Sequence, residues 1–193
     1  MAKVSWDGAT LLAPVPAVIV TSGTVEKPNA ATVAWTGIVC SEPPMTYISL
    51  RKSRFTHKLV SQTGEFVINL TTGSLAKATD ACGVYTGAKM NKISAYSLTP
   101  EKATKLSCPT LAQSPVSLEC RVVEVKELGS HDMFLAEIVA VDVEESLIDD
   151  KGKLDLKKAN LLAYSHGDYI QLGKKIGSFG FAVKKKSKGK GKA

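Results

Sequence analysis

The stretch NAATVAWTGIVCSEPP, residues 29–44, sets the first expectation about the fold. It carries one formal charge, at Glu42, and six of its first nine residues are Ala, Thr or Gly around the single aromatic residue Trp35. Small side chains on an extended segment let a flat or bulky group approach the backbone closely. We therefore expect a β-strand, stopped by Pro43 and Pro44, that is either a plain buried strand or one wall of a binding site.

The positive charge of the chain is concentrated at one end. The 193 residues carry a formal net charge of +7, and six lysines between Lys184 and Lys192 leave about +1 for the rest. A nearly neutral body has no broad basic face for nucleic acid, and the tail lacks the interleaved aromatic residues of single-strand binders. We expect one domain over residues 1–183 and a disordered, solubilising tail over 184–193, with weak contact to anionic polymers or membranes as the alternative.

The four cysteines, Cys40, Cys82, Cys108 and Cys120, contain no CxxC pair, which argues against a zinc or iron–sulfur site. No apolar run approaches the roughly 20 residues that span a bilayer, and the first residues do not resemble a signal peptide. We expect a cytoplasmic protein with reduced thiols, no metal, and no membrane or nucleic-acid partner.

Strand patterns dominate the chain. A helix is expected after Ser53, its predicted cap, with Gly64 at its end, and a second at residues 74–81, while residues 83–106 are expected to form a long surface loop. Residues 133–143 are apolar on both faces except for Glu137, which is typical of a central strand. About seven strands without a βαβ rhythm predict a mainly β fold, an antiparallel β-barrel with a few short helices. Strands are expected at residues 15–21, 29–42, 45–51, 65–70, 116–122 and 133–143, with shorter elements at 161–164 and 169–172.

The order of several motifs resembles the flavin reductase-like FMN-binding split-barrel family, and its flavoredoxin type in particular. The motifs span residues 14–183 and run PVPAVIVTS, NAATVAW, SEPP, ISLRKSRFT, GEFVINL, DACGVYTGAKMNK, LGSHDMFLAEIVAV and HGDYIQLGKKIGSFGF. The resemblance implies a six-stranded antiparallel split barrel that forms a homodimer and binds one FMN per subunit near the dimer interface. We expect Tyr164, Tyr169 and residues 173–181 near the shared edge.

The resemblance also implies which residues contact FMN. Residues 29–36 would hold the ring and ribityl chain, and LRKSRFT would hold the phosphate, for which a helix N-terminus and Arg side chains are suited. Trp35 would otherwise fill the end of the barrel, and the cations of LRKSRFT would otherwise be ordinary surface residues. Which of Lys89 and Lys92 reaches the flavin stays open. The residues so assigned are Asn29, Thr32, Val33, Ala34, Trp35, Thr36, Leu50, Arg51, Lys52, Ser53, Arg54, Thr56, Lys89, Asn91 and Lys92.

No Ser-His-Asp set, paired carboxylates or metal-type histidine spacing is evident, so the flavin itself would carry the redox chemistry. His131, in the turn GSHD, is the candidate catalytic residue, because related reductases place a similar histidine over the flavin to meet the nicotinamide. Without the resemblance, a histidine in a turn is an exposed bystander. We expect an FMN-dependent oxidoreductase that takes electrons from NADH, NADPH or a reduced electron-transfer protein; the alternative is a non-catalytic FMN-binding electron carrier.

Overall fold

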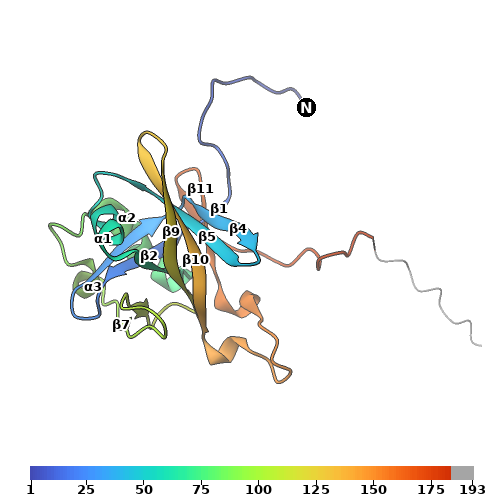
Figure 1. The fold of residues 1–193 in the computed structure, drawn as a ribbon. Coiled ribbons are helices and arrows are strands. Elements are labelled where there is room, and N and C mark those ends of the chain that lie inside the picture. The colour runs from blue at the N-terminus through green and yellow to red at the C-terminus, as the bar shows by residue number, and fades with distance from the viewer. Residues whose placement is uncertain (184–193) are drawn as a thin grey trace, which may run out of the picture.

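The computed structural model describes residues 1–183, and seven of its strands form one curved main sheet with helices at one end (Figure 1). The strands are β1 (Val15–Pro16), β2 (Val18–Gly23), β3 (Pro28–Val33), β4 (Thr36–Ser41), β5 (Pro44–Arg51), β6 (Glu65–Leu70), β7 (Pro100–Glu101), β8 (Thr110–Leu111), β9 (Val116–Glu127), β10 (His131–Val143), β11 (Leu162–Ser165) and β12 (Asp168–Gln171). The helices are α1 (Phe55–Thr63), α2 (Ala76–Val84) and α3 (Lys92–Ala95), with 3₁₀ turns η1 (Gly73–Leu75), η2 (Glu145–Leu147) and η3 (Leu156–Ala159).

Seven strands form the main sheet, in the order β3-β2-β6-β9-β10-β5-β4, and every neighbouring pair is antiparallel. The mainly β, antiparallel architecture is confirmed, but the main sheet has seven strands where six were expected. The two edge strands, β3 and β4, follow each other in the chain, so the sheet curls until its edges approach. The opening between these edges is the split of the barrel.

The predicted single strand over residues 29–42 is wrong, because the chain turns a corner at Ala34 and Trp35. Before the corner it pairs with β2, and after it the chain pairs with β5. The backbone carbonyl of Trp35 accepts a hydrogen bond of 2.9 Å from the N–H of Ser49, which ties the corner to β5. Pro43 and Pro44 lie at the turn into β5, where the strand break was expected.

The core lies inside the curl and includes the fully buried side chains of Phe66, Phe134 and Ile48. Burial along the first half of β10 alternates, with inward residues buried and outward residues half-buried. Val141, further along the strand, is 52% exposed. The expectation that β10 is buried on both faces is therefore not met within one chain.

Asn69 joins four segments inside this core. Its amide nitrogen donates to the carbonyl of Ile19 and to the hydroxyl of Thr21, each at 3.0 Å. Its amide oxygen accepts from the N–H of Leu111 at 3.0 Å and from the hydroxyl of Ser117 at 2.9 Å. A buried polar group is stabilising only when it is bonded in this way, and here the bonds fix β2, β6, β8 and β9 to one another.

Helix α1 closes one end of the barrel. It ends as predicted at Gly64, which adopts φ +67° and donates its N–H to the carbonyl of Val60 at 2.8 Å. The expected cap Ser53 is wrong, because the residue at the N-cap is Arg54 and its side chain makes no capping bond. The cap residue's side chain therefore leaves the first backbone N–H groups of the helix uncapped.

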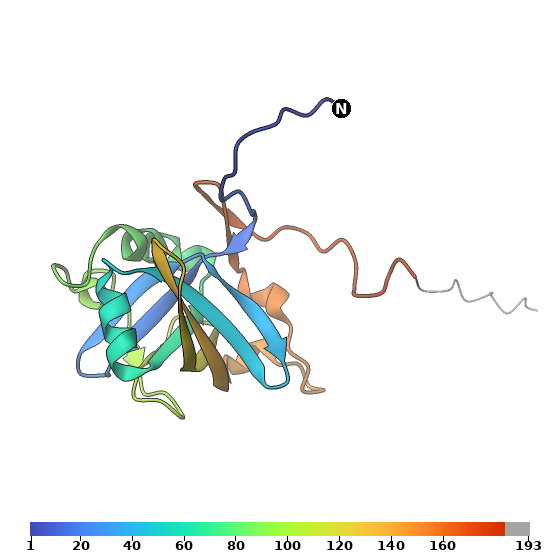
Figure 2. The same ribbon diagram turned by 45° about the horizontal axis from the view of Figure 1, so that its top comes forward.

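Both ends of the described chain leave the body as extended arms (Figures 1 and 2). β1 pairs with β11 and β11 with β12, so the two arms depart from one small three-stranded sheet. Within residues 1–183, no helix is long and apolar enough to cross a membrane. The predicted Lys-rich tail, 184–193, lies outside the described residues.

Candidate functional site

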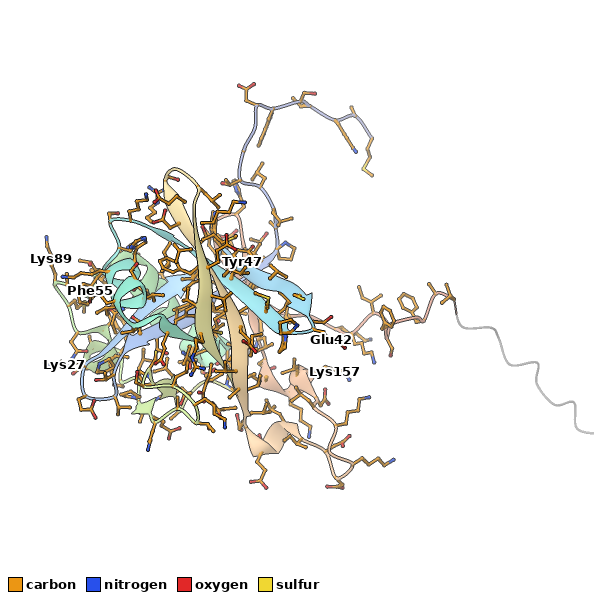
Figure 3. All side chains as sticks on the ribbon, in the orientation of Figure 1. Lys27, Glu42, Tyr47, Phe55, Lys89 and Lys157 are labelled. Carbon is orange, nitrogen blue, oxygen red and sulfur yellow. The ribbon has the colours of Figure 1, made fainter. Side chains whose placement is uncertain are left out.

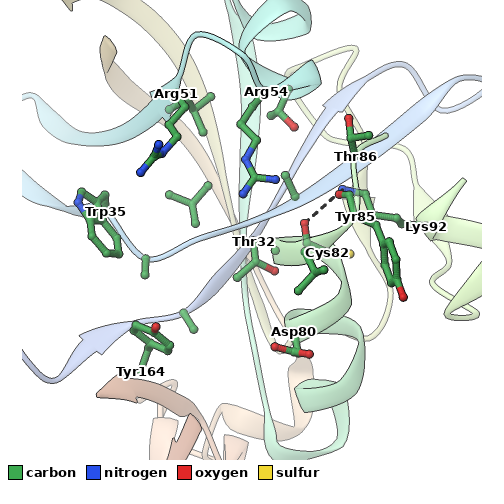
Figure 4. Close-up of a pocket in the computed structure, with 18 of the residues that line it drawn as sticks. Thr32, Trp35, Arg51, Arg54, Asp80, Cys82, Tyr85, Thr86, Lys92 and Tyr164 are labelled. Carbon is green, nitrogen blue, oxygen red and sulfur yellow. Dashed lines mark hydrogen bonds between the residues drawn. The ribbon is translucent and has the colours of Figure 1, made fainter. Parts of the chain in front are cut away.

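An open cavity of about 420 Å³ lies at the split of the barrel (Figure 4). One wall is the corner between β3 and β4, and another is the end of β5 with the start of α1. The end of α2 with the loop after it, and the hairpin of β11 and β12, complete the rim. Residues from several separate parts of the chain meet here, as expected for a ligand site.

One end of the cavity is cationic. Arg51 and Arg54 are both exposed, and Figure 4 shows their guanidinium groups directed into the same space. Lys92 lines the cavity from the other side, and unlike the two arginines it is only 3% exposed. Three cations that converge on one cavity make a site for an anion.

Lys92 is a buried cation without an acidic partner. Its Nζ donates to the carbonyls of Cys82 at 3.2 Å and Tyr85 at 2.9 Å, at the C-terminal end of α2. Burial lowers the pKa of Lys92, and the charge of Arg54 lowers it further. Among the described residues no carboxylate lies within 4.0 Å of Nζ. An ammonium group has three donors, so one N–H is left for a ligand.

The hydroxyl of Thr56 also lines the cavity, and Asn29 determines its role. The amide nitrogen of Asn29 donates to the Thr56 hydroxyl at 2.9 Å and to the Ser22 hydroxyl at 3.1 Å. Since the Thr56 oxygen accepts from Asn29, its own proton is free to donate elsewhere. Gly87 packs directly on the same amide, because a Cβ at Gly87 would meet the Asn29 oxygen at 1.9 Å.

The opposite wall contains two tyrosines and a carboxylate. Tyr164 and Tyr169 pair across β11 and β12 with their ring centroids 5.5 Å apart. Burial raises the pKa of Tyr169 to about 12, and the nearby charge of Asp80 adds to the rise. The Tyr169 phenol therefore stays neutral at pH 7, and it lies near the Asp80 carboxylate. The cavity is cationic at one end and has hydroxyl and carboxylate groups at the other.

His131 stands at the rim, where it begins β10 and lies opposite Arg51 in the strand register. Its Nδ1 lies 2.9 Å from the hydroxyl of Ser130. Burial lowers the pKa of His131, and the positive charge of Arg51 lowers it further. The neutral imidazole is therefore favoured at pH 7, and within residues 1–183 its Nε2 has no hydrogen-bond partner.

Residues 11–173 match the family described as the flavin reductase like domain. The chain belongs to this family. A protein of Archaeoglobus fulgidus is 35% identical over 146 residues, which cover 76% of this chain and 82% of that relative. Flavoredoxin of Desulfovibrio vulgaris (Miyazaki F) has a TM-score of 0.88 at 28% identity, over 95% of this chain and 100% of that one. Flavoredoxin from Methanosarcina acetivorans has a TM-score of 0.86 at 26% identity, with the same coverage. The resemblance found in the sequence is thus confirmed.

The structure brings most of the predicted site residues of this flavin reductase-like chain into one cavity. The prediction missed the wall of the cavity that lies opposite the cationic end. This wall comes from residues that were assigned to no site or only to the dimer edge. The predicted residues that line the cavity are Thr32, Val33, Ala34, Trp35, Leu50, Arg51, Arg54, Thr56, Lys92 and His131. The lining residues that were missed include Ala31, Ser49, Asp80, Cys82, Gly83, Val84, Tyr85, Thr86, Gly87, Tyr164, Gly167 and Tyr169.

Six predicted residues do not line this cavity. Asn29 lies behind Thr56, and Ser53 is an exposed residue of the turn before α1. The Thr36 hydroxyl bonds to the carbonyl of Tyr47 at 2.6 Å, and the residue lines a neighbouring cavity.

Each of the remaining three has another role or position. Lys52 pairs with Glu127 at 2.6 Å, on the outer side of the rim. Asn91 caps α3 by accepting from the N–H of Ser94 at 3.2 Å. Lys89 is exposed and points away from the body (Figure 3). Of the two candidate lysines, the one on the cavity is Lys92.

A second cavity of about 560 Å³ adjoins the first and shares Ala34, Trp35, Tyr164 and Gly167 with it. Its other lining residues are Thr10, Leu11, Leu12, Ala13, Val15, Thr36, Tyr47 and His166. Trp35 is 44% exposed and stands between the two cavities, so it does not simply fill the end of the barrel.

The structure also brings two carboxylates together, which the sequence did not indicate. Glu119 is fully buried and accepts from the N–H groups of Thr104 at 2.6 Å and Lys105 at 2.7 Å. Asp142 lies beside it, and its Oδ2 is buried without a partner. Neither residue lines the cavities described above, so we assign this pair to the fold rather than to the site.

Proposed function

We propose that the cavity at the split of the barrel binds FMN and that the protein is an oxidoreductase of the flavin reductase type. The observation that carries the proposal is the buried Lys92, whose charge has no acidic partner within residues 1–183 and converges with Arg51 and Arg54. A buried cation is costly unless it is paired, and a phosphate would supply the missing negative charge. Membership of the flavin reductase like family supports a flavin as the group that carries the phosphate.

The residues present fit FMN in three respects. The cationic end suits one dianionic phosphate, and Thr56 adds a donor there. The start of α1, with an uncapped N-terminus and no acidic residue in its first turn, offers backbone N–H groups to the same anion. Small residues at Ala31, Ala34 and Gly83 leave room for a flat ring against the backbone.

FMN, when bound, would take up a hydride or electrons from a donor and pass them to an acceptor. The chain's own residues would bind and orient the two partners. Trp35 would cover one side of the ring, and the neutral His131 at the rim would hold the donor through Nε2. Ser130 would fix the orientation of that imidazole through Nδ1.

We propose NADH or NADPH as the donor, because His131 and Arg51 stand together at the open rim, where a carboxamide or phosphate could reach them. A non-catalytic electron carrier is the second candidate, and the similarity to two flavoredoxins favours it. Mixing the FMN-loaded protein anaerobically with NADH and with NADPH separates the two. Rapid bleaching of the flavin bands supports a reductase, whereas unchanged bands with both donors favour the carrier.

We also propose that the protein is a homodimer. Trp35, Ile38 and Val39 lie on and beside the edge strand β4 and are 44%, 67% and 50% exposed. Apolar residues gathered along an edge strand mark a surface that needs cover. Sedimentation of the FMN-loaded protein at micromolar concentration tests this proposal, and a monomer would overturn it.

A further inference from the structure

The C-terminal arm, residues 172–183, carries large apolar side chains that its own chain leaves uncovered. Ile176, Phe179 and Val183 are 95%, 106% and 83% exposed. Figures 1 and 3 show the arm projecting away from the body. Exposed apolar groups of this size, gathered on one short segment, mark a surface that binds another.

The end of the described arm forms a hydrogen-bonded turn. The N–H of Phe181 donates to the carbonyl of Ser178 at 2.9 Å, and the N–H of Val183 donates to that of Gly180 at 3.2 Å. Gly180 adopts φ +78°, and a Cβ at Gly177 would meet the ring of Phe181 at 2.5 Å. The turn therefore tucks Phe181 against Gly177 and presents Phe179 outward. An aromatic side chain on a preformed turn loses little conformational freedom on binding.

The second cavity offers a matching surface. Leu11, Leu12, Trp35, Tyr47 and Tyr164 give it an apolar and aromatic lining. The exposed apolar residues of edge strand β4 lie next to it and extend this surface. The lining is mostly uncharged, which suits an aromatic side chain rather than a charged ligand.

The arm starts beside the cavity but leads away from it. It follows β12, whose partner β11 contributes Tyr164 to the cavity wall. In a two-fold dimer, a segment that leaves one copy at this position can reach the same position on the other. A dozen extended residues reach at most about 40 Å, enough to cross onto a neighbouring copy.

We propose that two copies of the chain exchange C-terminal arms, with the turn at residues 178–183 of one copy seated over the second cavity of the other. This inference rests on the homodimer proposed above. Phe179 would then pack against Trp35 and Tyr47 of the partner. Because Trp35 and Tyr164 wall both cavities, the arm of one subunit would complete the flavin site of the other, and FMN binding would strengthen dimerisation.

Photocross-linking of the full-length protein tests the exchange. Phe179 is replaced by p-benzoylphenylalanine, and the variant is mixed with wild-type protein that is isotopically heavy. After irradiation, we expect cross-links from the light residue 179 to heavy peptides that contain Trp35 or Tyr47. Cross-links that join only light peptides of one chain, or that reach other parts of the surface, would overturn the exchange.

A matched pair of substitutions gives a second readout. Phe179→Asp should raise the dimer dissociation constant at least tenfold, whereas Ser178→Asp, which adds the same charge one residue away, should change it less than threefold. Equal effects, or no effect of Phe179→Asp on a protein that remains dimeric, would overturn the exchange and leave the dimer standing. If the wild-type protein is a monomer, both the arm exchange and the homodimer proposal are wrong. The flavin spectrum of the same sample would report separately on the cofactor.

Discussion

The side-chain amide of Asn29 donates a hydrogen bond of 2.9 Å to the hydroxyl of Thr56, and this bond links β3 to the first turn of α1. Asn29 is 6% exposed and does not line the cavity, whereas Thr56 does. The amide thus acts on the site through another residue. It holds the Thr56 oxygen as an acceptor, so that the hydroxyl proton is left to donate to an anion.

Asn29→Ala should weaken FMN binding about five- to tenfold, the cost of one misdirected hydrogen bond of roughly 1 kcal/mol. Calorimetric titration of the wild type, Asn29→Ala, Thr56→Val and the double variant measures how this loss depends on Thr56. If Asn29 acts through Thr56, Asn29→Ala should cost nothing further in the Thr56→Val background. Additive losses would mean that Asn29 supports the site only by general stability.

Arg54→Gln should weaken FMN about 10- to 100-fold, because a charge-assisted hydrogen bond contributes roughly 1.5–3 kcal/mol. Riboflavin, which lacks the phosphate, should lose less than twofold. Lys58→Gln is the control, since Lys58 is an exposed cation on the same helix that does not line the cavity. Equal losses for FMN and riboflavin would place the phosphate elsewhere.

His131 should titrate below the ordinary histidine pKa of about 6.5, since both burial and the charge of Arg51 favour its neutral form. Arg51→Gln should raise that pKa toward the ordinary value. An NMR titration of the histidine ring protons follows both proteins. A His131 pKa that Arg51→Gln leaves unchanged would contradict this coupling.

His131→Ala should slow flavin reduction by NADH or NADPH about 10- to 100-fold, the loss expected for a positioning contact of roughly 1.4–2.8 kcal/mol. FMN affinity should stay nearly the same, because His131 is not part of the cationic end. Stopped-flow traces measure the rate of flavin reduction, and a titration of the same variant measures its affinity for FMN. Unchanged reduction kinetics would make His131 a bystander and favour the carrier.

Asp142 should make the fold sensitive to pH. Burial raises the pKa of Asp142, and the neighbouring Glu119 carboxylate raises it further, so the folded protein holds this proton above the ordinary carboxyl pKa. Stability from this group is therefore full below the ordinary pKa and is lost as pH rises through the folded-state pKa.

Asp142→Asn should remove the loss of folding stability that ionisation of Asp142 causes as pH rises. The free energy of unfolding at pH 7 should therefore increase, by less than about 1 kcal/mol because the site is partly open to solvent. Glu137→Gln, an exposed acid on the same strand, is the control. Urea unfolding of the three proteins at pH 4 and pH 7 checks it. If Asp142→Asn increases the free energy of unfolding equally at pH 4 and pH 7, the titration of Asp142 is not the cause of the increase.

The sequence predicted most strands and the end of α1 because these depend on local patterns, such as alternation along β9 and a glycine at position 64. It could not predict the break at Trp35. Residues 29–42 are uniformly suited to an extended chain, and the corner depends on a hydrogen bond from Ser49, which is distant in sequence. Ser53 was expected to cap α1 because of its residue type alone, but the N-cap is Arg54 and the helix starts at Phe55.

The candidate site shows the same division. The cations of LRKSRFT were found because they are adjacent in sequence, and the structure adds Lys92, the first residue of α3, which is distant from them in sequence. Asp80 and Tyr169 were not assigned to the site, since nothing local shows that β11 and β12 fold back over α2. The role of Asn29 as a residue behind the wall follows only from the bond to Thr56.

The most direct test of the account is a calorimetric titration of cofactor-free, wild-type protein with FMN and with riboflavin under the same conditions. With the phosphate between Arg51, Arg54 and Lys92, FMN should bind about 10- to 100-fold more tightly than riboflavin. The difference should shrink as salt rises, because the two arginines are exposed. Equal affinities for the two flavins, or no binding of either, would contradict it.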